Sequence, residues 1–364
     1  MAVTPGVSPG EAHSRLLADF DARRPAALAR AVSVVENRRA GFEQLLAALH
    51  PRLGRARRIG LTGPPGAGKS TLATALAAHW RSTDLTVGII AVDPTSPFTG
   101  GALLGDRIRM ESVALDPGIF IRSMATRGSL GGLAATTREV ADVLDAFGFD
   151  RIVIETVGVG QSELEIAHTA DTSVVVLVPE SGDSIQTLKA GLMEIADVFV
   201  VNKSDRPGAD RLRHELELML GLRGGKVFRN IPAHHGVDLK RVANPAKAAR
   251  EAAAASDATE WTPPVLATTA QAGTGIDALA DALNRHFDYL ARSGTLRERR
   301  RQRLREQVVE VVERDVRRRL WSDAATTEWL NAQLPALESG GITPFEVAAE
   351  LLRRSANLLT RADA

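Results

Sequence analysis

The segment that most constrains the fold runs from residue 58 to residue 80. Arg58 to Thr62 is a short, mostly apolar strand, Ser70 to Trp80 favours a helix, and the connection reads Gly-Pro-Pro-Gly-Ala-Gly-Lys-Ser. This connection matches the phosphate-loop pattern G-x-x-x-x-G-K-[ST], in which a strand, a glycine-rich turn and a helix follow one another directly. The pattern therefore predicts an α/β sheet with an anion-binding loop at the carboxyl end of a strand.

The loop has the chemistry that a polyphosphate requires. Gly66 and Gly68 allow the backbone N–H groups to turn toward an anion, because a Cβ atom would obstruct them. Lys69 is predicted to contact the β- and γ-phosphates and Ser70 to hold Mg²⁺. A ligand-free glycine-rich turn is the alternative. The residues predicted to bind the phosphates are Gly63, Pro64, Pro65, Gly66, Ala67, Gly68, Lys69, Ser70 and Thr71.

A second motif, Asn202-Lys203-Ser204-Asp205, follows the apolar strand that ends at Val201. The Asp205 carboxylate can accept hydrogen bonds from two donors of guanine, whereas adenine offers one donor and one acceptor. The motif therefore predicts GTP or GDP and not ATP; a helix cap after a strand is the alternative. Downstream, the backbone of Thr269, Ala270 and Gln271 is predicted to cover the guanine O6.

Composition excludes several classes of protein. The 45 basic and 44 acidic side chains nearly cancel, so no overall charge attracts the chain to nucleic acid or to a membrane. The absence of cysteine excludes disulfides, thiolate metal sites and cysteine nucleophiles. Without a signal segment or a long apolar run, the expected location is the cytoplasm.

Strand and helix patterns alternate between Ile59 and about Phe287, after a helical segment at residues 13–50. This alternation predicts a P-loop NTPase of the α/β class, with a doubly wound, mostly parallel sheet. The expected domains are an N-terminal helical extension (1–52), a GTPase domain (53–290) and a C-terminal helical arm (291–364). The arm's first helix has an apolar stripe that predicts dimerisation, although its many arginines leave a nucleic-acid surface as the alternative. The stripe consists of Leu304, Val308, Val311 and Val312.

Two further strand ends carry acidic residues. Asp93 follows the strand Val87 to Val92 and is predicted to support the Mg²⁺ shell. Glu155 ends the apolar strand Arg151 to Glu155. It precedes Gly158 by three residues, as in the acidic-x-x-Gly switch of GTPases. Glu155 is expected to reach a magnesium-bound or attacking water, and the Gly158 amide to sense the γ-phosphate.

These motifs together resemble the MeaB/ArgK family, the GTPases associated with methylmalonyl-CoA mutase. The most specific stretches are Glu-Thr-Val-Gly-Val-Gly-Gln-Ser (155–162) and Leu-Lys-Ala-Gly-Leu-Met-Glu (188–194). The resemblance extends over about residues 15–360. It implies a homodimeric chaperone that binds an adenosylcobalamin-dependent acyl-CoA mutase, gates cofactor loading and helps to eject damaged cofactor.

The resemblance also implies roles for individual residues. Asp106 would join Ser70, Asp93 and Glu155 around Mg²⁺, and residues 180–189 would form an additional switch. The catalytic candidates are Lys69, Glu155 and Lys189. Lys189 is hypothesised to stabilise the charge of the transferring phosphoryl group only when the partner docks. The arginine candidates for the same role are Arg107, Arg109 and Arg127.

Two other functions and one segment remain open at this level. A metallochaperone GTPase would need cysteine-containing motifs or a histidine-rich tract, and a kinase linked to amino-acid transport would need an acceptor site. Residues 221–247, with His234 and His235, match no motif of the family and are interpreted as a solvated loop in preference to a metal site. The sequence does not name the particular mutase.

Overall fold

The structure is a computed structural model of the 364-residue chain. It describes residues 9–94, 110, 113–126, 132–156, 165–179, 190–223 and 261–357. The chain divides into two compact units, residues 1–299 and residues 300–364.

The first unit is built on a seven-stranded sheet in the order β3-β2-β4-β1-β5-β6-β7. Every pair of neighbouring strands is parallel, so the prediction of a largely parallel, doubly wound sheet is confirmed. The strands are β1 (Arg57–Thr62), β2 (Val87–Pro94), β3 (Ile119–Thr126), β4 (Arg151–Thr156), β5 (Thr172–Leu177), β6 (Val198–Val201) and β7 (Val265–Ala267).

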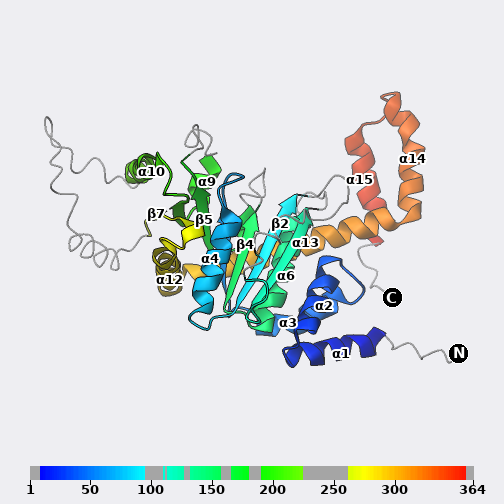
Figure 1. The fold of residues 1–364 in the computed structure, drawn as a ribbon. Coiled ribbons are helices and arrows are strands. Elements are labelled where there is room, and N and C mark those ends of the chain that lie inside the picture. Colours follow the sequence, from blue (N-terminus) through cyan, green and yellow to red (C-terminus); the bar gives the residue numbers. More distant parts are fainter. Residues whose placement is uncertain are drawn as a thin grey trace, which may run out of the picture. The chain divides into compact units, whose positions relative to one another are not determined.

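Helices cover both faces of this sheet (Figure 1). α4 and α12 pack on one face with Ile89, while α1, α2, α3 and α6 pack on the other with Ile90, as the twofold alternation of a strand requires. α9 and α10 cover β5 and β6 on the second face. Their bounds are α1 (Pro9–Asp21), α2 (Pro25–Glu36), α3 (Phe42–Leu49), α4 (Lys69–Arg81), α6 (Gly132–Phe147), α9 (Ala190–Ile195), α10 (Ala209–Arg223) and α12 (Ile276–Ser293), with short 3₁₀ turns η1 (His50–Arg52), η2 (Ile166–His168) and η6 (Ala270–Ala272).

The register places the predicted motifs at one edge of the sheet. β1 lies between β4 and β5, with Leu61 beside both Glu155 and Val174. Because all the strands run in the same direction, their carboxyl ends lie along the same edge. The phosphate loop, Glu155 and the Asn202 motif therefore meet there, although more than one hundred residues separate the first from the last.

The opposite, amino-terminal edge is held by a buried charge cluster around Arg58. Its guanidinium donates to Asp142 (2.7 Å) and Asp145 (3.0 Å), and its backbone N–H donates to Asp171 (3.1 Å). Burial lowers the pKa of Arg58, but the three surrounding carboxylates raise it overall, so the guanidinium stays charged. Asp145 also accepts hydrogen bonds from the backbone N–H groups of Gly54, Arg55 and Ala56. The cluster thus fastens α6 to the start of β1.

The second unit contains the rest of α13 (Thr295–Ser322), α14 (Ala324–Glu338) and α15 (Pro344–Arg354). The last helix has Pro344 in its first turn, where the missing N–H of proline costs no helical hydrogen bond. Thr343 caps it, because the Thr343 hydroxyl accepts from the Glu346 backbone while the Glu346 carboxylate accepts from the Thr343 backbone. A bilayer-spanning helix is not found in the part of the chain that the structure describes.

We predict that Asp145→Ala lowers the free energy of unfolding by about 3–5 kcal/mol, because it leaves a buried guanidinium and three backbone donors without their shared acceptor. Urea unfolding followed by circular dichroism measures the change. Asp210→Ala is the matched control, since the Asp210 side chain is 98% exposed and its loss should cost less than about 0.5 kcal/mol. Equal effects of the two substitutions would contradict the structural role of Asp145.

Candidate nucleotide-binding site

The phosphate loop has a backbone that only glycine accommodates at its key positions. Gly63, Gly66 and Gly68 have positive φ angles of 132°, 77° and 84°. A Cβ atom on Gly63 would lie 2.1 Å from the Val176 carbonyl oxygen, and one on Gly68 would lie 2.5 Å from the side-chain nitrogen of Asn202. The loop is therefore pressed against β5 on one side and the second motif on the other.

Lys69 begins α4 and its side chain is buried within this loop. The ammonium group donates to the carbonyl oxygens of Gly63 (2.8 Å) and Pro64 (3.0 Å). The ammonium group therefore lies close to the backbone N–H groups of the phosphate loop. This position is expected for a cation that neutralises a bound anion. The Lys69 ammonium therefore lies within the phosphate loop, and its contact with the β- and γ-phosphates stays a prediction.

Ser70 and Glu155 form the second contact of the site. The Ser70 hydroxyl donates to the Glu155 carboxylate at 2.6 Å, and both residues are buried. Beside them, the Thr156 hydroxyl donates to the Thr62 hydroxyl at 3.1 Å. Ser70 and Glu155 provide hard oxygen atoms, the type of ligand that Mg²⁺ prefers, so this donor set fits the predicted ion. Asp93 is the residue of β2 that follows Val92, and Val92 pairs with Thr156 of β4. The backbone of Asp93 therefore lies at the same edge of the sheet as Glu155.

Asn202 connects three loops through one buried amide side chain. Its Nδ2 donates to the Ala67 carbonyl oxygen in the phosphate loop (2.9 Å). Its Oδ1 accepts from the Thr268 hydroxyl (3.1 Å) and from the Ala270 backbone N–H (3.1 Å). Because all of these bonds are shielded from water, Asn202 fixes the distance between the phosphate loop and the segment 268–273.

The exposed part of the second motif faces the same segment. The Ser204 hydroxyl lies 3.1 Å from the Thr269 hydroxyl, which in turn donates to Asp205 at 3.4 Å. Lys203 adopts the left-handed region, with φ of 56°, and this turns the chain sharply between the strand end and Asp205. Asp205 is exposed beside Thr269, as a carboxylate that receives a ligand must be.

The structure thus brings together the phosphate loop, Ser70 with Glu155, and the Asn202 motif with residues 269–271. Several predicted residues lie outside the described part of the chain, and their placement is untested. These are Asp106, Gly158, Lys189, the switch segment 180–189, Arg107, Arg109, Arg127, His234 and His235, together with the side chain of Asp93. Among the described residues there is no cluster of three or more His, Cys, Asp or Glu side chains that would hold a metal ion.

Sequence reasoning missed Thr268 as a structural partner of Asn202. It also missed the charged residues at the amino-terminal edge, Asp171 and Asp197, each of which directly precedes an apolar strand. That position was the available signal, because a carboxylate at the start of a buried strand can satisfy neighbouring backbone donors.

The arrangement has the parts of a nucleotide site. A loop of backbone donors with a buried ammonium group suits phosphates. The Ser70 and Glu155 oxygens suit a divalent cation. The Asp205 carboxylate, beside Thr269, suits a base with two hydrogen-bond donors.

Comparisons with known proteins agree with the geometry. Residues 28–325 match the family model described as methylmalonyl Co-A mutase-associated GTPase MeaB. A solved structure described as LAO/AO transport system kinase superposes with a TM-score of 0.65 at 27% identity, covering 96% of this chain and 99% of its own.

Three sequence relatives support the same assignment. GTPase ArgK of Escherichia coli is 34% identical over 326 residues, 88% of this chain and 89% of its own length. A Mycobacterium tuberculosis protein named "probable GTPase" is 38% identical over 340 residues, 92% of this chain and 93% of its own. The mouse methylmalonic aciduria type A homolog, which is mitochondrial, is 32% identical over 300 residues, 81% of this chain and 65% of its own. This chain belongs to the MeaB family of GTPases.

Proposed function

We propose that this GTPase is a chaperone for an adenosylcobalamin-dependent acyl-CoA mutase, specifically methylmalonyl-CoA mutase, in the cytoplasm. It would gate loading of the cobalamin cofactor and protect or reactivate the mutase. The observation that carries the proposal is the match of residues 28–325 to a family described as mutase-associated. The name of the mouse relative, which refers to methylmalonic aciduria, points in the same direction.

Within this proposal, the phosphate loop binds the triphosphate through its backbone N–H groups and Lys69. On binding, the Lys69 ammonium would exchange the carbonyl oxygens of Gly63 and Pro64 for phosphate oxygens. Bound Mg²⁺ would neutralise charge on the β- and γ-phosphates, with Ser70 and Glu155, supported by Asp93 and Asp106, as the residues that hold it.

Hydrolysis requires an oriented water and a compensating cation. Glu155 lies at the end of β4 next to Ser70, which suits it to orient the attacking water. We assign Lys189 the second role, in which it contacts the γ-phosphate only when the mutase docks. Gly158, between these residues in the chain, would donate its amide to the same phosphate and so report its presence.

Guanine recognition is assigned to Asp205 and the segment 269–271. The Asn202 side chain holds these loops at a fixed separation from the phosphate loop, so that a base and a phosphate tail can be bound together. Lys203, in its left-handed conformation, would lie along the base.

We predict that Asp205→Asn reverses base preference from GTP toward XTP by at least about 100-fold, because an amide places a donor where xanthine has a carbonyl oxygen in place of the guanine amino group. Competition of fluorescent nucleotides measures both affinities. Asp210→Asn serves as the control, because Asp210 is an exposed carboxylate on α10, and this variant should preserve the preference for GTP. Retention of full GTP selectivity by Asp205→Asn would show that another residue recognises the base.

We predict that the chain binds purified methylmalonyl-CoA mutase with affinities that differ at least about fivefold between GDP and a non-hydrolysable GTP analogue, because a nucleotide can act on the partner only through such a difference. Calorimetry measures the affinities, and phosphate release measures stimulation of GTP hydrolysis by the mutase. Lys69→Ala, which should lose nucleotide binding, is the control and should show a single affinity. Absence of a complex in both nucleotide states would overturn the mutase assignment, and other acyl-CoA mutases can be tested in the same assay.

We further propose that the chain is a homodimer that pairs through α13. Leu304, Val308 and Val312 are 47%, 63% and 53% exposed, and Val311 between them is 39% exposed. Their spacing places them on one side of the helix, where a solvated apolar stripe is unfavourable unless a partner covers it.

The double substitution Val308→Glu and Val312→Glu is expected to weaken dimerisation by at least about 100-fold, because it places unpaired charges in the proposed interface. Size-exclusion chromatography with light scattering measures the mass. Arg317→Glu adds a similar charge at an exposed position on the other side of α13 and should leave the dimer intact. A wild-type monomer, or a dimer that survives the double substitution, would refute the α13 interface.

A further inference from the structure

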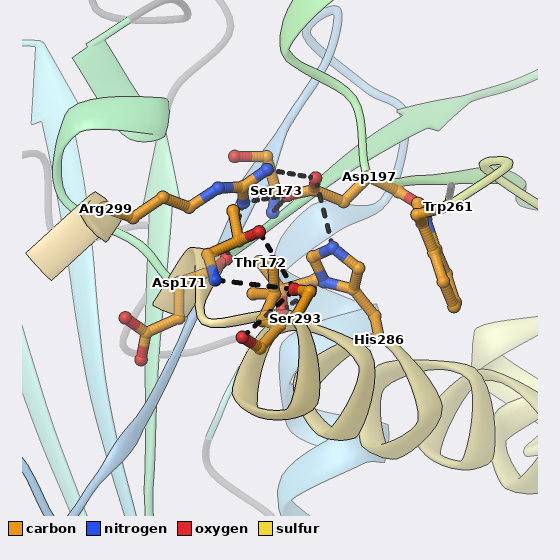
Figure 2. Close-up of polar contacts among 10 residues, drawn as sticks. Asp171, Thr172, Ser173, Asp197, Trp261, His286, Ser293 and Arg299 are labelled. Atoms are coloured by element: carbon orange, nitrogen blue, oxygen red, sulfur yellow. Dashed lines mark hydrogen bonds and ion pairs between the residues drawn. The ribbon is translucent and has the colours of Figure 1, made fainter. Parts of the chain in front are cut away.

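Asp197 joins five elements at the amino-terminal edge of the sheet (Figure 2). It directly precedes β6, and its carboxylate accepts from the Ser173 backbone N–H of β5 at 2.8 Å. Its own backbone N–H donates to the Ser173 carbonyl oxygen at 2.9 Å, and its carbonyl oxygen accepts from the Trp261 indole at 2.8 Å. Trp261 leads into β7, so Asp197 connects the starts of three neighbouring strands.

Two basic side chains complete this contact set. Arg299, in the first turns of α13, donates to both carboxylate oxygens of Asp197 (3.0 and 3.1 Å) and to the Asp171 carbonyl oxygen (2.9 Å). His286 of α12 places Nε2 3.3 Å from the carboxylate, while its Nδ1 lies 2.8 Å from the Thr172 hydroxyl. Burial alone would raise the pKa of Asp197, but the contacts with His286 and Arg299 lower it below its ordinary value. The carboxylate is therefore held in its charged form.

The strands and the helix that meet at Asp197 carry, at their other ends, the two segments to which guanine binding is assigned. These segments, residues 202–205 and residues 268–273, are called the guanine loops. β6 has four residues and ends directly before Asn202, and β7 has three and ends directly before Thr268. α12 begins at Ile276, just after the same loop, and reaches His286 after ten residues, or about 15 Å. Short strands and a helix transmit a displacement at one end to the other, because the hydrogen bonds of the sheet and of the helix stiffen their backbones.

The phosphate loop is supported differently. β1 pairs with β4 on one side and with β5 on the other, whereas β7 is an edge strand that pairs only with β6. Asp197 reaches β1 only through β5, so loosening its contacts should displace the guanine loops more than the phosphate loop, with the Asn202 hydrogen bonds as the remaining link between the two.

We propose that Asp197 and Arg299 are positioning residues for guanine recognition, which hold β6, β7 and α12 so that Asp205 and the segment 268–273 keep their spacing. This inference rests on the proposed assignment of those loops to the guanine base. Because coupling between two sites is reciprocal, guanine binding stabilises the Arg299 to Asp197 contact in turn.

The test compares a nucleotide with a ligand that has no base. Arg299→Gln should weaken GDP binding about 5- to 50-fold and change pyrophosphate binding less than about twofold, both measured by calorimetry on the full chain. Arg299→Lys should restore part of the GDP affinity, because an ammonium keeps the charge but loses the two-pronged geometry. Arg297→Gln, at an exposed position two residues earlier in the same helix, is the matched control and should leave both affinities unchanged.

The outcomes separate positioning from simple stabilisation. Equal losses for GDP and pyrophosphate, or no loss for either, would mean that Arg299 only stabilises the fold and would overturn the inference. A wild-type chain that binds pyrophosphate but not GDP would overturn the guanine assignment and the inference together. If wild-type GDP binding is intact and Arg299→Gln matches it, the inference alone fails.

A second measurement applies if Arg299→Gln does not fold. Hydrogen exchange of the wild-type backbone at residues 295–303 should slow when GDP is added and should not change with pyrophosphate. Identical exchange in the presence of the two ligands would overturn the inference.

Discussion

The structure depends on the parallel pairing of its strands. Parallel neighbours require a crossover between them, so helices cover both faces of the sheet and all connecting loops of one type lie at one edge. Gly63, Glu155 and Asn202 become neighbours for this reason, although they belong to distant parts of the chain. An antiparallel arrangement of the same strands would distribute these residues over opposite edges.

The two edges of the sheet use polar side chains differently. At the carboxyl edge, Asn202 bonds to loop atoms on both sides, which leaves Asp205 exposed for a ligand. At the amino edge, Asp145 and Asp197 are enclosed by backbone donors and by arginines from other elements. At the amino edge, the carboxylates therefore have hydrogen-bond partners within the protein itself. The contacts of Asp197 fix the starts of the short strands β6 and β7.

Local patterns were sufficient to predict the sheet and the strand, turn and helix of the phosphate loop, because each has a signature within a few residues of sequence. The positions of Asn202 and Lys69 were also predictable, since Asn202 follows an apolar strand and Lys69 follows a glycine-rich turn, while their contacts with a nucleotide stay a prediction. The cluster around Arg58 was not, because its partners Asp142 and Asp145 lie more than eighty residues away and only the packing of α6 brings them near. Asp197 has a local signal in its position before an apolar strand, but its partners were not predictable, because they come from β5, α12 and α13.

The placement of Lys69 has a consequence for what the loop can hold. Its ammonium group donates to two carbonyl oxygens, those of Gly63 and Pro64, so a bound anion would compete with the oxygen atoms of the loop itself for this cation. A single small anion offers few oxygens at suitable positions, whereas a chain of linked phosphates offers several. The loop therefore contains its own competitor for the Lys69 ammonium, and this competition favours an anion with several oxygen atoms over an anion with few.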